Sequence, residues 1–319
     1  MLPIIDFADF RTGDTERRLR VARDIGRALS QIGFFYVRGH GIAETTMQRA
    51  RAAAEGFFAQ PVAEKRKVRR QAGRYRGYIP PIPFVTENAA AGRPPILYEA
   101  FLAGADVAPD DAIVATTKGL IAPTPWPGKP AGFRSGITAY WDAVDGLARD
   151  LLGAFALSLD APEDALLTHF KQPLTNLSLL HYPARPKANA ETDGAADDAA
   201  AHYDTNAVTI VMPGVVGGLE VKRRDGRWFD AEPLPDCFIV NIGNMMECWS
   251  GGKYRSTMHR VHPPLGVDRF SIAHFAVPDY ETVVRPLPSH AEEAGRRAAI
   301  AAGPELAAFV ARFDDAPRE

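Results

Sequence analysis

The chain has 319 residues, of which 46% are hydrophobic and 24% are charged, and its formal net charge at pH 7 is −2. This length suits one large domain or two small ones, and the composition supports a sizeable apolar core rather than a disordered chain. The near-neutral charge gives no electrostatic reason to expect binding to nucleic acid or to an anionic membrane surface.

The two cysteines, Cys237 and Cys248, imply no disulfide framework. No apolar run approaches the length of a membrane span, and the first residues lack the basic and apolar regions of a signal peptide. We therefore expect a cytoplasmic protein, and the sequence implies no obligate protein partner.

Helical and strand patterns alternate in the first half of the chain. Asp14 can cap a helix whose apolar residues recur at helical spacing, and Gly33 ends it. The basic stretch from Lys65 to Arg76 is typical of a solvated helix face, although its end mixes aromatics with arginines that could reach into a pocket. The elements expected in chain order are a strand at 3–7, a helix at 14–32, a strand at 34–37, a helix at 44–58, a loop at 79–95, a strand at 98–101 and a long helix at 133–159.

From Leu177 onward the pattern changes to short strands separated by turn signals, which is typical of a sandwich or barrel. Residues 183–201 carry almost no apolar bulk, so we expect either a mobile lid over a site or an unstructured surface insertion. A C-terminal helix is expected from Ala291 to Phe313, outside the barrel. The strands are expected at 177–182, 202–212, 219–223, 237–242, 258–262 and 269–277.

Two histidines and one carboxylate stand out in this strand-rich half, namely His202 and Asp204 in His202-Tyr203-Asp204, and His259. They form the ligand set of a mononuclear non-haem Fe(II) site that keeps open coordination positions. In a strand, residues i and i+2 point to one face, so His202 and Asp204 can reach one metal while Tyr203 points away. A His-x-Asp pair alone occurs by chance on surface strands, but its conjunction with the later residues favours a metal site.

Arg269 and Ser271 follow the last of these ligands on a strand-like segment. Alternation places Arg269, Ser271 and Phe275 on one face of that strand. A guanidinium inside a barrel is costly unless it is paired, and a bound carboxylate would pair it through two hydrogen bonds. Together with the metal site, this pair suggests an oxygenase that uses iron, O2 and a 2-oxoacid.

The remaining histidines are expected to be structural. His274 alternates to the face opposite Arg269, and His181 alternates to the wrong face beside Tyr182. The others are His40, in a Gly-His-Gly turn, and His169, His262 and His290, which we expect at the surface or in hydrogen bonds.

Short segments that are similar to those of one enzyme family occur in the same order along nearly the whole chain. In the first half they are Leu2-Pro3-Ile4-Ile5-Asp6-Phe7, Gly33-Phe34-Phe35-Tyr36-Val37, Gly39-His40-Gly41-Ile42 and Arg76-Gly77-Tyr78-Ile79-Pro80 with Glu99-Ala100-Phe101. In the second half they are His202-Tyr203-Asp204, Gly217-Gly218-Leu219-Glu220-Val221, Asn241-Ile242-Gly243-Asn244, Tyr254 to Val261 and Arg269-Phe270-Ser271. With these segments the chain resembles the 2-oxoglutarate- and Fe(II)-dependent oxygenases of the isopenicillin N synthase type.

The resemblance implies a mainly β fold with flanking α elements, in which a double-stranded β-helix (jelly-roll) core carries an N-terminal α/β module and outer helices. The corresponding segments are an N-terminal dioxygenase module at 1–110, a linking helical segment at 111–175, the catalytic core at 176–285 and a C-terminal helix at 286–319.

The resemblance also implies roles for single residues. His202, Asp204 and His259 would bind iron, and Arg269 and Ser271 would hold the distal carboxylate of 2-oxoglutarate. Tyr182 falls where the family often has an Asn-Tyr-Tyr-Pro motif, so its hydroxyl is expected to contact the cosubstrate or the substrate. Leu180 stands where many members carry Asn, so hydrogen bonding around the keto-acid end is expected to differ.

The implied reaction is a 2-oxoglutarate-dependent oxidation of a small molecule, by hydroxylation, desaturation or ring closure, with release of succinate and CO2. Arg74, Arg76, Tyr78 and Phe275 are candidate substrate residues, and an arginine there would favour an amino acid, another small acid or a specialised metabolite. Two alternatives stay open. One is an oxidase of the same fold that uses iron and O2 without 2-oxoglutarate, like isopenicillin N synthase or aminocyclopropane-carboxylate oxidase, and the other is a non-catalytic jelly-roll binding module.

Overall fold

The computed structural model describes residues 1–84, 96–185, 201–290, 298–312 and 314. The strands are β1 (Ile4–Asp6), β2 (Phe34–Arg38), β3 (Gly77–Phe84), β4 (Ile96–Ala103), β5 (Asn176–Tyr182), β6 (Val208–Pro213), β7 (Leu219–Lys222), β8 (Trp228–Asp230), β9 (Phe238–Ile242), β10 (His259–Val261), β11 (Arg269–Ala276), β12 (Val283–Val284) and β13 (Ile300–Ala301). The helices are α1 (Ala8–Thr12), α2 (Thr15–Gln31), α3 (Glu44–Phe58), α4 (Val62–Arg66), α5 (Ala112–Thr116), α6 (Phe133–Ser158), α8 (Asn244–Trp249) and α9 (Ala302–Ala311).

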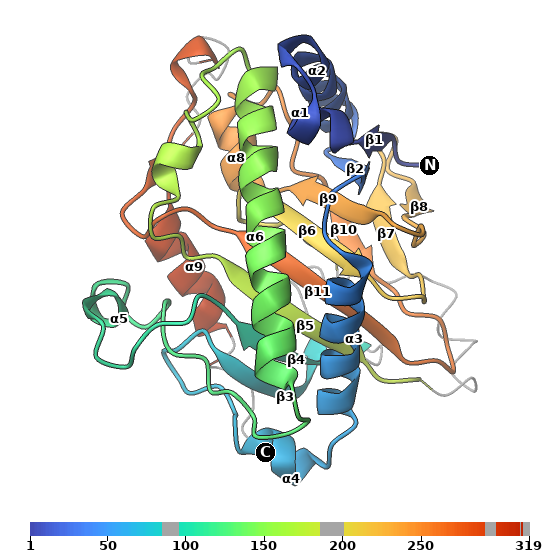
Figure 1. Cartoon of the computed structure of the whole chain (residues 1–319), viewed down its shortest axis with the longest axis vertical. Coiled ribbons are helices and arrows are strands. Elements are labelled where there is room, and N and C mark those ends of the chain that lie inside the picture. Colours follow the sequence, from blue (N-terminus) through green and yellow to red (C-terminus); the bar gives the residue numbers. More distant parts are fainter. Residues whose placement is uncertain (85–95, 186–200, 291–297, 313, 315–319) are drawn as a thin grey trace.

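The strands form one large sheet and smaller ones beside it (Figure 1). The order in the large sheet is β1-β2-β9-β6-β11-β5-β4-β3, and β10-β7-β8 form a second sheet. Neighbouring strands run antiparallel except β1 and β2, which are parallel. The two sheets give the expected jelly-roll core with helices outside. Strands from segment 1–110 complete both edges of the large sheet, so this segment and segment 176–285 share one sheet.

Side-chain alternation gives the large sheet an inner face toward the small sheet and an outer face toward the helices. On β2, Phe34 and Tyr36 pack in a small core with Val221 of β7, whereas Phe35 and Val37 pack in the main core with the helices. Residues directly opposite each other on antiparallel strands share a face. The register of each strand pair therefore assigns inner and outer positions across the whole sheet.

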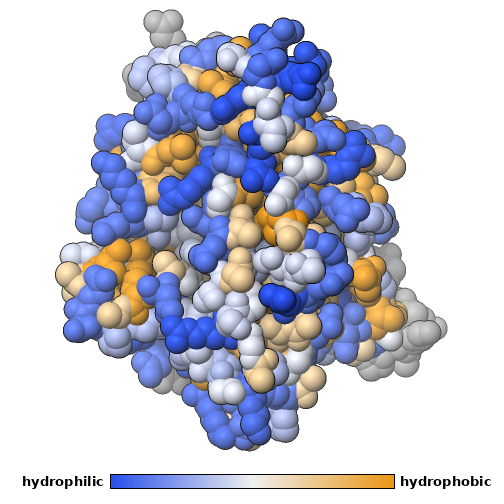
Figure 2. Space-filling view, viewed as in Figure 1, coloured by the Kyte–Doolittle hydropathy of each residue, from blue (hydrophilic) through white to orange (hydrophobic). Residues whose placement is uncertain are grey.

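The outer face is covered by long helices that the sequence predicts well. Figure 1 shows α6 running lengthwise across the sheet with α3 beside it. The predicted helices at 14–32, 44–58 and 133–159 are confirmed as α2, α3 and α6, each within one residue at either end. The Asp14 side chain caps α2 by accepting a hydrogen bond of 2.9 Å from the Arg17 amide. Seen from this side, the surface is mostly hydrophilic, with apolar side chains in small separate groups (Figure 2).

The loop expected at 79–95 is wrong in its first part, because β3 continues to Phe84, and its remaining residues, 85–95, lie outside the described residues. Pro80 and Pro81 lie at an irregularity of the β3–β4 pairing between Ile79 and Ile82. In addition, β3 is the edge strand of the large sheet. Proline is tolerated at bulges and edges because no ladder hydrogen bond is lost there.

The basic stretch at 65–76 is not a solvated helix face throughout. Helix α4 ends at Arg66, and Lys65 and Arg76 are both buried. Most of the expected lid segment and residues 291–297 of the expected C-terminal helix lie outside the described residues. The described part of that helix is wrong at 298–301, because Ile300 and Ala301 pair with β12 as strand β13 and the helix α9 begins only at Ala302. Within the described residues, no helix is both long and apolar enough to cross a membrane.

Candidate metal centre and anion site

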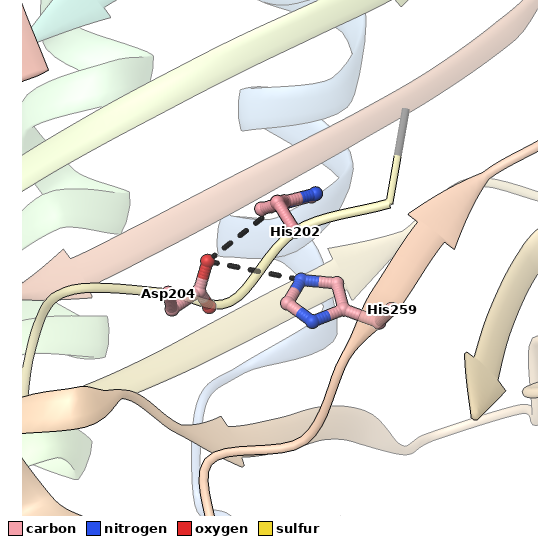
Figure 3. A group of neighbouring side chains, drawn as sticks. All are labelled: His202, Asp204 and His259. Atoms are coloured by element: carbon pink, nitrogen blue, oxygen red, sulfur yellow. Dashed lines mark ion pairs between the residues drawn. The ribbon is translucent and has the colours of Figure 1, made fainter. Parts of the chain in front are cut away.

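Three side chains with metal-binding atoms meet between the two sheets (Figure 3). His259 opens β10 in the small sheet, whereas His202 and Asp204 lie on the segment before β6. Asp204 Oδ1 lies 3.7 Å from Nε2 of His202 and 3.7 Å from Nε2 of His259, and the three ligand atoms lie within 4.8 Å of one another. Two imidazoles and one carboxylate in such a group fit Fe(II) with open coordination positions.

The expectation that His202 and Asp204 share a strand is wrong, because β6 begins only at Val208. His202 instead forms a single bridge with His259, in which each amide donates to the other's carbonyl oxygen, at 2.9 and 3.0 Å. The chain then leaves the ladder, and the Asp204 carbonyl oxygen accepts from the Asn244 amide at 2.8 Å. The bridge holds the two imidazoles side by side, with ring centroids 4.3 Å apart.

The Asp204 carboxylate is buried and held by two side chains of the large sheet. Its Oδ2 accepts hydrogen bonds from Thr209 Oγ1 at 2.5 Å and from Asn241 Nδ2 at 2.7 Å. Burial alone would raise the pKa of Asp204, but the positive charges that His259 and His202 carry when protonated, together with these hydrogen bonds, outweigh burial and lower the pKa. The carboxylate is therefore ionised, and its Oδ1 remains directed at the histidines.

The tautomer of His259 follows from its backbone contact. Its Nδ1 lies 3.1 Å from the Thr257 carbonyl oxygen, which can only accept a hydrogen bond. The proton is therefore assigned to Nδ1, and the Nε2 lone pair faces Asp204 and is available to a metal. Phe34 packs edge-on against the ring, with centroids 5.3 Å apart, and supports this orientation.

Arg269 lies on the inner face of β11 with only 3% of its surface exposed. Its Nε donates to the Gly217 carbonyl at 3.0 Å, and its Nη1 donates to Ser271 Oγ at 3.3 Å. Among the described residues, no carboxylate pairs with this guanidinium. Burial lowers the pKa of Arg269, yet an arginine stays protonated in proteins. A buried cation with unused donors calls for an anionic ligand.

Tyr182 of β5 lies directly opposite Arg269, and Leu180 lies opposite Ser271. The guanidinium carbon of Arg269 is 5.1 Å from the centroid of the Tyr182 ring, a cation–π contact that orients the fork. The register therefore brings Arg269, Ser271 and Tyr182 together. Leu180 adds an apolar neighbour on the same inner face.

Phe275 and Arg76 belong to a row of inner-face residues that leads to the metal group. Phe275 is paired with Asn176 of β5 on one side and with Thr209 of β6 on the other. Thr209 holds Asp204, and Asn176 accepts a hydrogen bond of 3.2 Å from Arg76 Nη1. The structure thus places both candidate substrate residues on the side of the sheet that carries the metal group.

The other two candidate substrate residues lie elsewhere. Arg74 is exposed at the surface. Tyr78 is fully buried on the outer face, where its hydroxyl bonds to Glu99 and its ring packs edge-on against Phe57. Gly77, with φ of 117°, breaks the alternation that would have put Tyr78 on the same face as Arg76. These positions argue against a substrate-binding role for Arg74 or Tyr78.

Sequence reasoning missed several residues around the metal group. Thr209 has no motif that links it to Asp204, whereas Asn241 did lie in a segment that matched the family. Tyr75 is buried next to Arg76, and burial, together with the nearby negative charge of Asp204, raises its pKa to about 12, although Arg76 opposes the shift. Its ring lies 5.3 Å from the guanidinium carbon of Arg76, so Tyr75, rather than Tyr78, is the tyrosine of this segment on the side of the site.

None of the other described histidines joins the metal group. His274 faces helix α6, where its Nε2 is 3.4 Å from Asp145 Oδ1, and His181 Nδ1 is 2.8 Å from Glu99 Oε1. Both therefore lie on the outer face, as the alternation predicted. His40 Nδ1 accepts from the Ile42 amide at 3.1 Å and stabilises its turn.

Comparison with known proteins agrees with this geometry. Residues 2–129 match the family described as non-haem dioxygenase in morphine synthesis N-terminal, and residues 174–278 match the 2OG-Fe(II) oxygenase superfamily. Homoarginine-6-hydroxylase 2-ODD-233 of Oryza sativa subsp. japonica is 32% identical over 307 residues, covering 92% of this chain and 90% of that protein. The 2-oxoglutarate-dependent dioxygenase citB of Monascus ruber is 32% identical over 294 residues, covering 90% and 87%.

Solved structures show the same likeness. A full-length Neurospora crassa protein in complex with alpha-KG and thymine is 26% identical, with a TM-score of 0.84 over 98% of this chain and 96% of that chain. A putative 2OG-Fe(II) oxygenase family protein from Caulobacter crescentus is 28% identical, with a TM-score of 0.82 over 98% and 99%. The chain belongs to the 2OG-Fe(II) oxygenase superfamily and is a 2-oxoglutarate-dependent dioxygenase that uses Fe(II), 2-oxoglutarate and O2.

Proposed function

We propose that His202, Asp204 and His259 bind the catalytic Fe(II), and that Arg269 and Ser271 bind the distal carboxylate of 2-oxoglutarate. The observation that carries the proposal is the pairing of a compact two-histidine, one-carboxylate group with a buried arginine that has no carboxylate partner among the described residues. When bound, the iron and 2-oxoglutarate supply the activation of O2 that oxidises the substrate, with release of succinate and CO2.

The protein contributes geometry and a fixed electrostatic setting. Thr209 and Asn241 hold one carboxylate oxygen of Asp204, so the other is presented to the metal. Arg269 donates to the Gly217 carbonyl and to Ser271 Oγ and contacts the Tyr182 ring, and these contacts leave part of its guanidinium available to a carboxylate. Tyr182 lies against this fork, and we assign it to the wall of the 2-oxoglutarate site.

The lack of a carboxylate partner for Arg269 among the described residues also bears on the two alternative functions. In an oxidase that works without 2-oxoglutarate, Arg269 would have to bind the substrate instead. A non-catalytic binding module would have no need of three metal ligands in one group. The substrate is a small molecule, and the proposal keeps the cytoplasmic location expected from the low cysteine content.

The test is conversion of labelled 2-oxoglutarate to succinate and CO2 by Fe(II)-loaded protein in air. Asp204→Ala should abolish the conversion, because one of three metal ligands is lost. Asp225→Ala removes an exposed aspartate of the β7–β8 turn and serves as the matched control, which should keep the wild-type rate. Full conversion by a folded Asp204→Ala variant would contradict the proposed iron site.

A further inference from the structure

Arg76 is a second buried arginine without a carboxylate partner among the described residues. Only 3% of its surface is exposed, and its pKa is lowered by burial to about 10, so it is charged at neutral pH. We propose that Arg76 binds the anionic group of the main substrate, which makes that substrate a small carboxylic acid. This inference rests on the proposed function above, because it places the acid beside the iron held by Asp204.

Hydrogen bonds to the chain hold the guanidinium of Arg76 in place, but they do not satisfy all of its donors. Nη1 donates to the Tyr75 carbonyl and to Asn176 Oδ1, both at 3.2 Å, and Nη2 donates to the Thr175 carbonyl at 3.0 Å. Its Nε is buried and has no hydrogen-bond partner within the part of the chain that the structure describes. All three acceptors are neutral, so the positive charge is oriented but not neutralised. A buried charge without a counter-ion lowers the stability of the fold unless a bound ligand supplies the opposite charge.

A glycine provides the room that the guanidinium needs. A Cβ at Gly104 would lie 2.2 Å from both Nε and Nη2 of Arg76. Gly104 follows β4, one residue beyond the pair Ala103 and Leu177, and therefore lies beside Asn176. The head of Arg76 thus lies over the inner face, where β4 ends and β5 begins, rather than in the helix-covered core.

The strand register gives the separation between the residue that Arg76 contacts and the residue that holds Asp204. Asn176, Phe275 and Thr209 lie side by side on three adjacent strands, β5, β11 and β6. With strands about 4.8 Å apart, Asn176 and Thr209 are roughly 10 Å apart across the sheet. Arg76 contacts the first of these residues, and Asp204 contacts the last. A small acid can therefore place its carboxylate at Arg76 and its body toward the iron.

One aromatic side chain, Phe275, lies in the row between the two ends, and another, Tyr75, lies beside Arg76. Phe275 is half-buried and belongs to neither apolar core, which fits a side chain that faces a ligand. Tyr75 is buried next to Arg76, and its ring lies 5.3 Å from the Arg76 guanidinium carbon. An apolar or aromatic body attached to the carboxylate matches this lining.

This anion site is distinct from the one at Arg269. Arg269 and Phe275 are six positions apart on β11, which corresponds to about 20 Å at about 3.3 Å per residue. A molecule of the size of 2-oxoglutarate held at Arg269 therefore does not occupy Arg76. The two arginines divide the inner face into a cosubstrate end and a substrate end.

The competing interpretation is that Arg76 only clamps the start of β5. A binding experiment on wild-type protein separates the two. The enzyme is loaded with Mn(II) in place of Fe(II) and with 2-oxoglutarate, and hexanoate, phenylacetate and 3-phenylpropanoate are each compared with their amides. Paramagnetic relaxation by Mn(II) reports both binding and orientation. We expect the acids to bind more tightly than the amides, with the protons next to the carboxylate farther from the metal than those at the other end.

Two substitutions then assign the selectivity to Arg76. Arg76→Gln keeps hydrogen-bonding capacity but removes the charge, and it should weaken binding of the preferred acid by roughly thirtyfold or more while changing amide binding by less than about twofold. Arg76→Lys should recover part of the loss. Arg74→Gln, which removes an exposed arginine of the same segment, is the matched control and should bind the acid like wild type.

Different measurements test the substrate-binding role of Arg76 and the binding of 2-oxoglutarate. If no acid binds better than its amide to wild-type protein, or if a folded Arg76→Gln variant retains the preference, the substrate proposal is wrong. The affinity for 2-oxoglutarate is read separately in each protein, and it should be the same in wild type and in both Arg76 variants. If wild-type protein does not bind 2-oxoglutarate at all, the proposed function is wrong. If Arg76→Gln does not fold, the orientation measured in wild type decides.

Discussion

Thr209 and Asn241 offer the sharpest test of how the fold prepares the metal group. Both donate to Oδ2 of Asp204, at 2.5 and 2.7 Å, and both are almost fully buried, so water cannot easily replace either donor. We predict that Thr209→Val and Asn241→Leu each weaken Fe(II) binding, and that the double variant weakens it further.

The magnitude follows from the charge on the acceptor. A hydrogen bond to a charged group contributes about 1.5–3 kcal/mol. Loss of a partner that orients a metal ligand typically costs about 10–100-fold in metal affinity, or roughly 1.4–2.8 kcal/mol. We therefore expect the Kd for Fe(II) to rise about tenfold or more in Thr209→Val, and by up to about a hundredfold in the double variant.

Anaerobic calorimetry, or competition with a chelator of known affinity, measures this Kd. Thr45→Val removes an exposed threonine hydroxyl from α3 and is the matched control, which should bind iron like wild type. The reasoning is refuted if folded Thr209→Val and Asn241→Leu proteins both keep the wild-type Kd, because Asp204 would then not depend on these bonds for its orientation.

Further predictions concern the outer face and acid stability. Tyr78→Phe should lower the free energy of unfolding by about 1–2 kcal/mol, since it removes a buried bond to Glu99, without changing iron or 2-oxoglutarate affinity; a changed affinity would return Tyr78 to the site. Lys65→Met should cost about 3–5 kcal/mol in urea unfolding because it leaves the buried Glu99 carboxylate without its cation, whereas exposed Lys67→Met should cost less than about 1 kcal/mol. Burial raises the pKa of Glu99, but hydrogen bonds from His181, Lys65 and Tyr78 outweigh it, so the folded pKa is depressed. The resulting stability is present above the unfolded carboxyl pKa of about 4.5 and is lost as pH falls through the folded value, so Glu99→Gln should flatten the decline of unfolding free energy with acid; an unchanged pH profile would contradict this.

The helices show what local sequence signals can predict. α2, α3 and α6 were expected within a residue of their ends, because apolar spacing, the Asp14 cap and Gly33 act within a few residues. By contrast, the loop predicted at 79–95 is wrong up to Phe84, where β3 ends, because prolines such as Pro80 and Pro81 normally argue against a strand. Only the tertiary position of β3, at the edge of the sheet and with an irregularity at these prolines, makes them acceptable.

The sequence identified the three residues of the metal group correctly, but the geometry that we expected for them was partly wrong. The residue types and order of His202, Asp204 and His259 were informative because few other roles need that set. The assumed shared strand was incorrect, since a cross-chain bridge between the two histidines and the Asn244 contact set the geometry instead. Such long-range pairing leaves no periodic trace in the sequence.

The substrate side was the least predictable part. Within one short segment the sequence offered Arg74, Arg76 and Tyr78 as equivalent candidates and left out Tyr75. Their positions depend on a positive φ at Gly77, which reverses the expected alternation and turns Tyr78 outward. Lys65 was equally misleading, because its burial depends on Glu99, which comes from a distant strand.

The central claim is that this chain binds Fe(II) and 2-oxoglutarate at one site, through the metal group and Arg269. The most direct measurement is an anaerobic titration of Fe(II)-loaded protein with 2-oxoglutarate, followed by the weak visible charge-transfer band of an iron-chelated 2-oxoacid. We predict that the band appears in wild type and that Arg269→Ala shifts the titration to much higher 2-oxoglutarate concentrations. Iron binding without any band, or an unchanged titration in Arg269→Ala, would contradict it.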